Sequence, residues 1–444
     1  MLPTIESLRE RLRLVITDKQ EQGHITEGLP EQLAAIPDAY DPLAEFARRL
    51  ADLPMRPDWR YDEPDDFEAI CARWDDPAAD PGSVDVDDAA ARAEAAFLGR
   101  VCGCILGKPV EFDPTLDELR AALEPLGEWP LRDYFPEAAI PRLRAPQLQW
   151  PDTVRERIRF VAQDDDINYT IIGMLMLESF GTGFTKENLR DVWMMQLPII
   201  ATFGPERTML ARAALNSLEG GDPSALDEWV RVANPRDEWC GALIRADAYG
   251  YGCMGRPALA AELAWRDASW THRRTGTYAT MFVAAAIASA PGAREPLDMF
   301  RAGLRYVPTK SRFHEITAAL LDEVSRAHDW LDGYERVRAL TPGMTHCRIY
   351  QEVGTLANTL RFASDVGDGI CKQVSQGNDT DSFGATAGSM LGAFFGPGHL
   401  EARWLAPFND EIRVALALFP ERSLSALTAR IGRLPARIAG DLKA

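Results

Sequence analysis

The chain has 444 residues, of which 46% are hydrophobic and 26% charged, a normal balance for a globular protein. Its formal net charge of −19 excludes a general nucleic-acid or anionic-membrane surface, because such a surface needs a basic face. The length allows one large domain or about two to three of ordinary size.

Cysteine usage and hydropathy indicate a cytoplasmic protein. The seven cysteines are scattered and contain no Cys-x-x-Cys pair, so the pattern predicts free thiols rather than a disulfide framework or a zinc site. The longest mostly apolar run, 279–290, is shorter than the roughly 20 residues that a membrane-spanning helix needs. The N-terminus lacks a basic start followed by an apolar core, so we expect no signal peptide.

Residues 1–88 are predicted to form a helical N-terminal extension and a linker. Apolar residues recur with helical spacing over 5–15, 31–36 and 43–50. Prolines and carboxylates between 54 and 66 indicate an extended connector, and the acidic, turn-rich stretch 77–88 indicates a boundary. No chemical motif occurs in this part, so we expect the chemistry to lie in a second unit, residues 89–444.

The second unit begins with a predicted helix from Ala89 to about Leu106. Asp88 can cap its start, and Gly107, followed by a proline, is suited to its end. The next residues place Glu111 between two apolar neighbours. The position alone does not decide whether this carboxylate decorates the surface or is held inward for a purpose.

Residues 113–160 are rich in proline and aromatic residues and are predicted to form a long excursion, called the insert below. Only 116–123 has clear helical spacing. Long ordered loops in compact domains are often functional lids or walls, and we interpret the insert in that way.

A first acidic cluster, Asp164, Asp165 and Asp166, opens a predicted helix. Neighbouring carboxylates repel one another by on the order of 1 kcal/mol per close pair, a cost that an exposed helix N-terminus tolerates and a divalent cation reverses. The three side chains converge only if the cluster sits at the turn into the helix, which its placement fits. An EF-hand loop is excluded because Tyr169 stands where that loop needs glycine.

The middle of the chain predicts helices separated by short Gly, Pro and Asn breaks. The missing side chain of Gly241 lets backbone N–H groups approach a phosphate or ribose, although an ordinary loop is the alternative. His272 stands alone, and a lone histidine is more often structural than a ligand. Helical spacing covers 276–290, 295–305, 311–331, 349–363 and 367–376. No strand-rich region or internal repeat occurs, so we expect a mostly or wholly α fold.

A second acidic cluster, Asp379-Thr380-Asp381-Ser382, precedes glycines spaced four residues apart, Gly384, Gly388 and Gly392. Carboxylate and hydroxyl oxygens are suitable ligands for Mg²⁺. The glycines share one helical face, which lets another helix come very close. The alternative is a simple helix N-cap with acidic residues in its first turn. We expect a deeply buried helix whose acidic N-terminus points at a site shared with the first cluster.

The order of these motifs resembles the ADP-ribosylglycohydrolase family, which is related to the enzyme that removes ADP-ribose from dinitrogenase reductase. The resemblance covers about residues 89–396 and rests on Gly-Lys-Pro-Val-Glu, on Asp-Asp-Asp opening a helix, and on Asn-Asp-Thr-Asp-Ser-Phe-Gly-Ala. It implies a compact all-α orthogonal bundle with two Mg²⁺ or Mn²⁺ ions in a central cleft. Residues 1–88 resemble an N-terminal extension found in some bacterial members.

Functional residues follow from the resemblance position by position. The implied metal ligands are Asp164, Asp165, Asp166, Asp379, Asp381 and Ser382. The implied substrate-binding residues are Glu111, Gly241, Arg245 and His272, and the implied catalytic residues are Glu111, Asp165 and Asp379. The sequence departs from the best-known members at Asp164 and Ser382, where they have threonine, and at Ala242, which replaces a small polar residue.

These residues predict a hydrolase that cleaves a ribosyl glycosidic bond with water activated at two metal ions. Its expected substrate is an ADP-ribosylated protein or a small molecule containing ADP-ribose. One alternative is a non-catalytic ADP-ribose-binding or immunity-type protein. Another is a haloacid-dehalogenase-type phosphatase, but the polar stretch 372–377 replaces the hydrophobic strand that such an enzyme needs before its first aspartate.

Overall fold

Helices build the whole of the described structure. The computed structural model describes residues 4–75, 84–144, 151–222 and 225–443. Within these ranges the chain forms 22 α-helices and nine 3-10 helices, and pairing of extended backbone is limited to isolated bridges. The expected all-α class is confirmed. None of the helices in these ranges is both long and apolar enough to cross a membrane.

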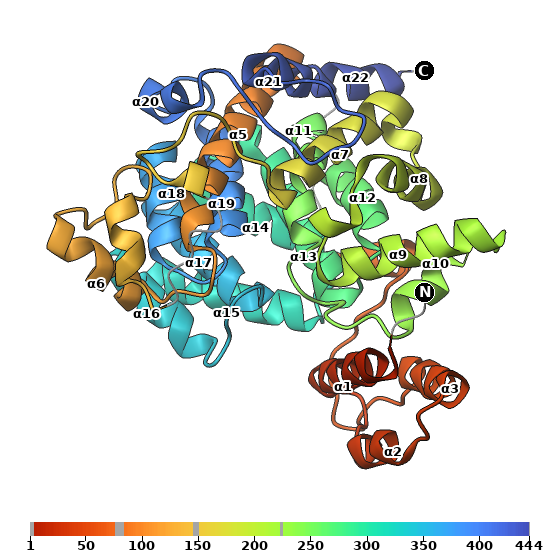
Figure 1. The fold of residues 1–444 in the computed structure, drawn as a ribbon. Coiled ribbons are helices and arrows are strands. Elements are labelled where there is room, and N and C mark those ends of the chain that lie inside the picture. Colours follow the sequence, from red (N-terminus) through yellow and green to blue (C-terminus); the bar gives the residue numbers. More distant parts are fainter. Residues whose placement is uncertain (1–3, 76–83, 145–150, 223–224, 444) are drawn as a thin grey trace.

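The N-terminal helices form a small lobe at one edge of the molecule (Figure 1). The lobe consists of α1 (Ile5–Glu21), α2 (Leu29–Ala35) and α3 (Tyr40–Ala51). Its apolar side chains make a separate core, to which Leu12, Phe46 and Leu50 belong. An irregular connector then leads to α4 (Phe67–Cys71), whose Ile70 is part of the main core. Most of the stretch predicted as a boundary, 77–88, lies outside the described residues.

Two helices in backbone contact form the centre of the larger body, α5 (Val86–Gly107) and α19 (Thr380–Phe395) (Figure 1). A Cβ atom added to Gly99 would lie 2.2 Å from the carbonyl oxygen of Gly388, and one added to Gly388 would lie 2.0 Å from the carbonyl oxygen of Gly99. A Cβ on Gly103 would likewise meet the oxygen of Gly384 at 1.9 Å. The predicted small-residue face is therefore the contact surface of this helix pair.

Further helices pack against the central pair, either directly or through intervening helices. They are α7 (Asp165–Phe180), α8 (Lys186–Gln196), α9 (Gly204–Glu219), α10 (Leu226–Arg231), α11 (Asp247–Gly252), α12 (Pro257–Ala268), α13 (Arg274–Ala288), α14 (Pro296–Leu304), α15 (Arg312–Arg326), α16 (Trp330–Leu340), α17 (Ile349–Phe362) and α18 (Val366–Ser375). The prediction of one continuous helix over 311–331 was wrong. The backbone of Ala327 is extended, and Asp329 starts α16 by accepting the N–H groups of Leu331 and Asp332, each at 2.9 Å.

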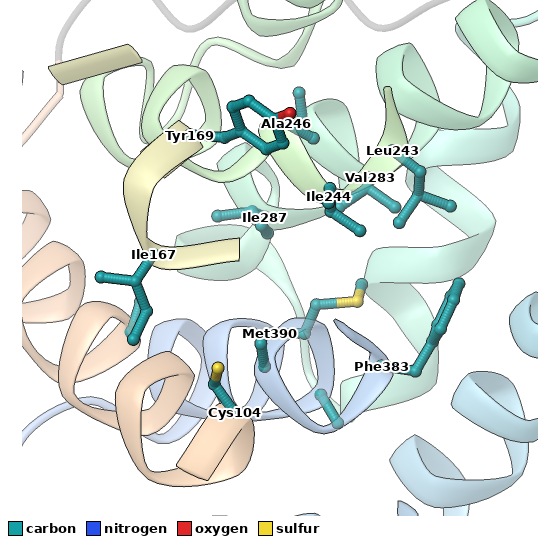
Figure 2. Packing of buried hydrophobic residues seen from close by; sticks show 14 of the residues in the cluster. Cys104, Ile167, Tyr169, Leu243, Ile244, Ala246, Val283, Ile287, Phe383 and Met390 are labelled. Atoms are coloured by element: carbon teal, nitrogen blue, oxygen red, sulfur yellow. The ribbon is translucent and has the colours of Figure 1, made fainter. Parts of the chain in front are cut away.

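The core beside the central pair brings distant segments together. Figure 2 shows Cys104 of α5, Ile167 of α7, Ile287 of α13 and Met390 of α19 converging on one apolar centre. The 3-10 helix η7 (Leu243–Arg245) contributes to the same cluster. As a result, the C-terminus of α5 and the N-termini of α7 and α19 meet.

The insert 113–160 is part of the packed body, with residues 145–150 outside the described range. It contains α6 (Leu116–Leu123), which matches the predicted helix. The hydroxyl of Tyr134 donates to the carbonyl oxygen of Trp404 at 2.7 Å.

The C-terminal helices are α20 (Ala402–Leu405), α21 (Leu424–Gly432) and α22 (Leu434–Asp441). The other 3-10 helices are η1 (Lys108–Val110), η2 (Glu124–Leu126), η3 (Glu137–Arg142), η4 (Pro151–Thr153), η5 (Gly181–Gly183), η6 (Ile199–Ala201), η8 (Ala290–Gly292) and η9 (Ala406–Phe408).

Candidate active site

The first acidic cluster forms the N-terminus of α7. Asp164 is the cap of this helix, and its Oδ1 accepts the backbone N–H of Asp166 at 2.8 Å. Asp164 and Asp166 are buried, while Asp165 is partly exposed to a cavity. The cluster therefore sits at the turn into the helix, where the three carboxylates can approach one another.

The second cluster lies at the N-terminus of α19 and meets the first. Ser382 Oγ donates a hydrogen bond to Asp166 Oδ2 at 3.1 Å. The carboxylate of Asp381 accepts the N–H of Ser382 at 2.9 Å. Thr380 ties this helix end to α5, because its hydroxyl donates to the carbonyl oxygen of Gly107 at 2.8 Å. Two segments that are far apart in the sequence thus form one acidic centre.

Lys108 places a fixed positive charge in this centre. Its ammonium donates a hydrogen bond to Asp164 and lies 3.7 Å from Asp381 Oδ2 and 4.0 Å from Glu111 Oε2. Burial alone would lower the pKa of Lys108, but Asp164 and Asp381 outweigh it and raise the pKa well above its usual value. Burial would raise the pKa of Asp164, whereas Lys108 holds it below its usual value. Both groups are therefore charged.

The pKa values of three other carboxyl groups of the centre are raised. Burial, and then the charge of Asp164, raise the pKa of Asp165 and of Asp166 well above their usual values. Burial, followed by the charges of Glu111 and Asp164, does the same for Asp381. A divalent cation would favour the ionised forms, and the carboxylate and hydroxyl oxygens present are the donors that hard cations take. The residues therefore fit the implied Mg²⁺ or Mn²⁺.

Two cavities open on either side of one acidic wall. The first has a volume of about 220 Å³ and extends from Asp379 and Ser382 to Gly241. The second has a volume of about 620 Å³ and extends from Asp164 to the segment 414–417. Glu111, Asp165 and Phe203 line both cavities. At the rim, the side chains of Ile200 and Phe203 are 78% and 58% exposed.

The structure separates the four predicted substrate-binding residues into two pairs. Glu111 and Gly241 line the first cavity. Arg245 and His272 are buried, and neither belongs to the described residues that line the two cavities. Arg245 donates to Glu206 and to Asp267, each at 2.6 Å.

Glu206 connects this buried network to the cavity. It lines the first cavity, and a Cβ added to Gly241 would lie 2.6 Å from its Oε1. Burial raises the pKa of Glu206 to about 7, although Arg245 opposes the change. Arg245 therefore does not line the cavity itself. It holds Glu206 against the loop that contains Gly241.

A sequence profile described as ADP-ribosylglycohydrolase matches residues 85–432, well over half of the chain. The chain belongs to the ADP-ribosylglycohydrolase family. A solved structure titled ADP-ribosylglycohydrolase-related protein complex is similar to it, with 21% identity, 79% of this chain and 99% of the other covered, and a TM-score of 0.47. A search of curated proteins finds no significant match.

Membership in the ADP-ribosylglycohydrolase family supports a hydrolase function of the glycohydrolase type. The matched residues include both acidic clusters and Glu111, whereas α1 to α4 lie outside the match. The family is typically metal-dependent, and the acidic centre supplies candidate ligands.

Several residues of the candidate site have no signal in the sequence. The thiols of Cys240 and Cys347 donate to Asp379 Oδ2 at 3.4 and 3.3 Å. Arg100 of α5 lies 3.2 Å from Asp166 Oδ1 and 2.9 Å from a carboxylate oxygen of Asp247. Sequence reasoning missed them because they lie far from their partners along the chain. Lys108 was visible within the Gly-Lys-Pro-Val-Glu motif but received no role.

The N-terminal lobe holds the loop of the ADP-ribosylglycohydrolase domain that borders the first cavity. Gln22 Nε2 donates to Asp237 Oδ1 at 2.7 Å, and Asp18 accepts the backbone N–H of Arg236 at 2.7 Å. Arg236 and Trp239 of this loop line the cavity. The lobe therefore contacts the cavity wall from outside.

Proposed function

We propose that the protein is a metal-dependent hydrolase that cleaves a ribosyl glycosidic bond and removes ADP-ribose from a protein side chain or a small molecule. The observation that carries the proposal is the meeting of the two acidic clusters through Ser382 and Asp166, next to a cavity bordered by Glu111. Family membership supports the same reaction class.

The ligands proposed for two Mg²⁺ or Mn²⁺ ions are Asp164, Asp165, Asp166, Asp379, Asp381 and Ser382. All of them offer oxygen, which hard cations prefer. When bound, such ions polarise substrate oxygens and lower the pKa of water. Lys108 pairs with Asp164, and Asp165 faces the cavity.

The chain's own chemistry centres on Glu111 and Asp165, which line both cavities. Burial raises the pKa of Glu111, Lys108 opposes this, and Asp164 adds to it. A carboxyl group with a raised pKa exchanges protons closer to neutral pH, as general acid–base catalysis at a glycosidic bond requires. In this proposal the scissile bond lies at this wall, with ADP-ribose in one cavity and the leaving group in the other.

The first cavity has features that suit a nucleotide sugar. Tyr169, Phe203 and Trp239 line it, and aromatic faces stack on bases or sugars. Its volume of about 220 Å³ is small for a whole ADP-ribose, so part of the ligand would extend past Phe203 toward the rim.

The test is hydrolysis of ADP-ribosylated arginine, ADP-ribosylated serine and small ribosides with Mg²⁺ or Mn²⁺ added. Asp379→Ala and Asp381→Ala should each abolish turnover, while Asp227→Ala, whose side chain is 81% exposed, serves as the control. Full activity of either site variant would reject the assigned centre. Calorimetric binding of ADP-ribose with no turnover of any substrate would instead favour the alternative, a non-catalytic ADP-ribose-binding protein.

A further inference from the structure

Two thiols and one carboxylate converge at the edge of the first cavity. The Sγ atoms of Cys240 and Cys347 lie 3.4 and 3.3 Å from Asp379 Oδ2, and the three potential ligand atoms all lie within 4.8 Å of one another. The residues come from three separate segments, namely the loop before η7, the loop before α17 and the start of α19. All three line the cavity.

The distances from the two sulfur atoms to Asp379 Oδ2 fit a tetrahedral metal site. A zinc ion takes sulfur at about 2.3 Å and carboxylate oxygen at about 2.0 Å, which at a tetrahedral angle separates the sulfur and oxygen ligands by about 3.5 Å. The two distances to Asp379 Oδ2 differ from this value by about 0.2 Å or less. Each sulfur atom therefore already lies at a suitable distance from the carboxylate oxygen for the two to share an ion.

Backbone contacts hold the three segments in this arrangement. The N–H of Cys240 donates to the carbonyl oxygen of Cys347 at 3.3 Å. The N–H of Asp379 donates to Glu352 Oε1 at 3.1 Å. These contacts fix the relative position of the donor residues before any ion binds, which reduces the cost of binding.

The donor set selects a different class of metal from that of the acidic centre. Thiolate ligands favour borderline and soft cations such as Zn²⁺, whereas the six implied ligands of the centre offer oxygen alone. Three protein ligands beside a cavity leave a fourth position open, as in catalytic zinc sites. His346 lines the same cavity and is hydrogen-bonded to Cys347.

We propose that Cys240, Cys347 and Asp379 form a binding site for a thiophilic divalent cation of the Zn²⁺ type. Binding releases the two thiol protons to solvent and replaces the S–H contacts to Asp379 with metal bonds. The site shares Asp379 with the acidic centre. It follows, resting on the proposed function, that zinc withdraws this carboxylate and inhibits hydrolysis supported by Mg²⁺.

The first experiment measures the metal alone. The protein is titrated with Co²⁺ and Zn²⁺ in a phosphine reductant, which keeps the thiols reduced. Wild-type protein should show thiolate-to-cobalt charge transfer and bind one zinc ion in competition with a chelating indicator. Cys240→Ser and Cys347→Ser should each lose the band and weaken zinc binding by about 100-fold or more, whereas Cys71→Ser, a partly exposed thiol on α4, should do neither.

Absence of the cobalt–thiolate band from the wild-type protein, or equal zinc affinity in all variants, would overturn the proposed site. Unfolding of a variant is checked separately through its melting curve without metal. If Cys240→Ser is unstable, Cys240→Ala and the wild-type spectrum decide the question.

The second experiment separates this site from the proposed hydrolase. Zinc inhibition is measured in each variant relative to that variant's own rate without zinc. Loss of zinc inhibition in both serine variants supports the shared role of Asp379, and undiminished inhibition contradicts it. If no ADP-ribosyl substrate is hydrolysed at all, the proposed function fails, while the cobalt spectrum still decides the metal site.

Discussion

The ammonium of Lys108 is hydrogen-bonded to the carboxylate of Asp164 in the middle of the acidic centre, and the two side chains are only 4% and 0% exposed. The pair shows how the carboxylate of Asp164 is accommodated inside the protein. The positive charge of Lys108 balances the negative charge of Asp164.

Removal of this balance should destabilise the fold. Lys108→Met leaves Asp164 buried without its partner, which typically costs about 3–5 kcal/mol, although protonation of the carboxylate limits the loss. We expect a drop of about 3 kcal/mol in the free energy of unfolding, measured in urea with a chelator present. Mg²⁺ should restore more stability to this variant than to the wild type, because a cation can replace the missing charge.

A surface pair provides the matched control for that experiment. Lys372 is bonded to Asp368 in a partly exposed pair on α18, so Lys372→Met should cost less than about 1 kcal/mol. Equal losses for Lys108→Met and Lys372→Met would show that the pair with Asp164 has no special role. The double change of Lys108 to Met and Asp164 to Asn should recover much of the lost stability.

The backbone contact between α5 and α19 should not tolerate a methyl group. In Gly388→Ala the new Cβ would lie 2.0 Å from the oxygen of Gly99, so the two helices must separate. We expect a loss of about 3 kcal/mol or more, at or beyond the upper end of the usual range for overpacking, because the obstacle is backbone. The measurement is a denaturant unfolding curve.

Gly440 on α22 is the control for a helical glycine with open space around it. A Cβ there would have no atom within 4 Å, so Gly440→Ala should stabilise the protein by up to about 1 kcal/mol through helix propensity. If Gly388→Ala were as harmless as Gly440→Ala, the close contact of the central helices would be refuted.

Glu206 should make stability depend on pH between about 4.5 and 7. Burial raises the pKa of this carboxyl in the folded protein to about 7 from its usual 4.5, so the folded state holds a proton that the unfolded chain has lost. The stability contributed by this group is therefore present at low pH, falls as the pH rises to about 7, and changes no further above it. The fall should be on the order of 1–3 kcal/mol.

Glu206→Gln cannot ionise and should flatten this part of the stability profile, measured by urea unfolding at about pH 5, 6, 7 and 8. Glu219→Gln, at the exposed end of the same helix, is the matched control and should keep the wild-type slope. An unchanged slope in the Glu206 variant would mean that the carboxyl does not titrate in this range.

The N-terminal lobe should stabilise the loop at the first cavity. Gln22→Ala removes the hydrogen bond to the buried carboxylate of Asp237, a change that costs about 1–3 kcal/mol when the remaining group is left unsatisfied. Hydrogen exchange at the amides of 236–241 should become faster, whereas the exposed change Gln20→Ala should leave it unaltered. Exchange that is the same in both variants would show that the lobe does not support the loop.

The sequence by itself determined the local features of this protein. Helical periodicity predicted most helices, and the glycine spacing of residues 384–392 predicted the close helix pair. The position of Asp164 at the turn into α7 was also predictable, because a cap residue accepts the N–H groups of the residues that follow it in the chain. The break before α16 is equally local, because Asp329 caps that helix, although helical spacing alone did not predict it.

Only the tertiary structure decided which side chains share the centre. It paired Lys108 with Asp164, directed Arg245 into the network behind the cavity, and brought Cys240 and Cys347 to Asp379. The physical reason is distance along the chain. Caps and periodicity depend on neighbours within about one helical turn, whereas these contacts exist only because close packing of the whole chain brings remote segments to the same place.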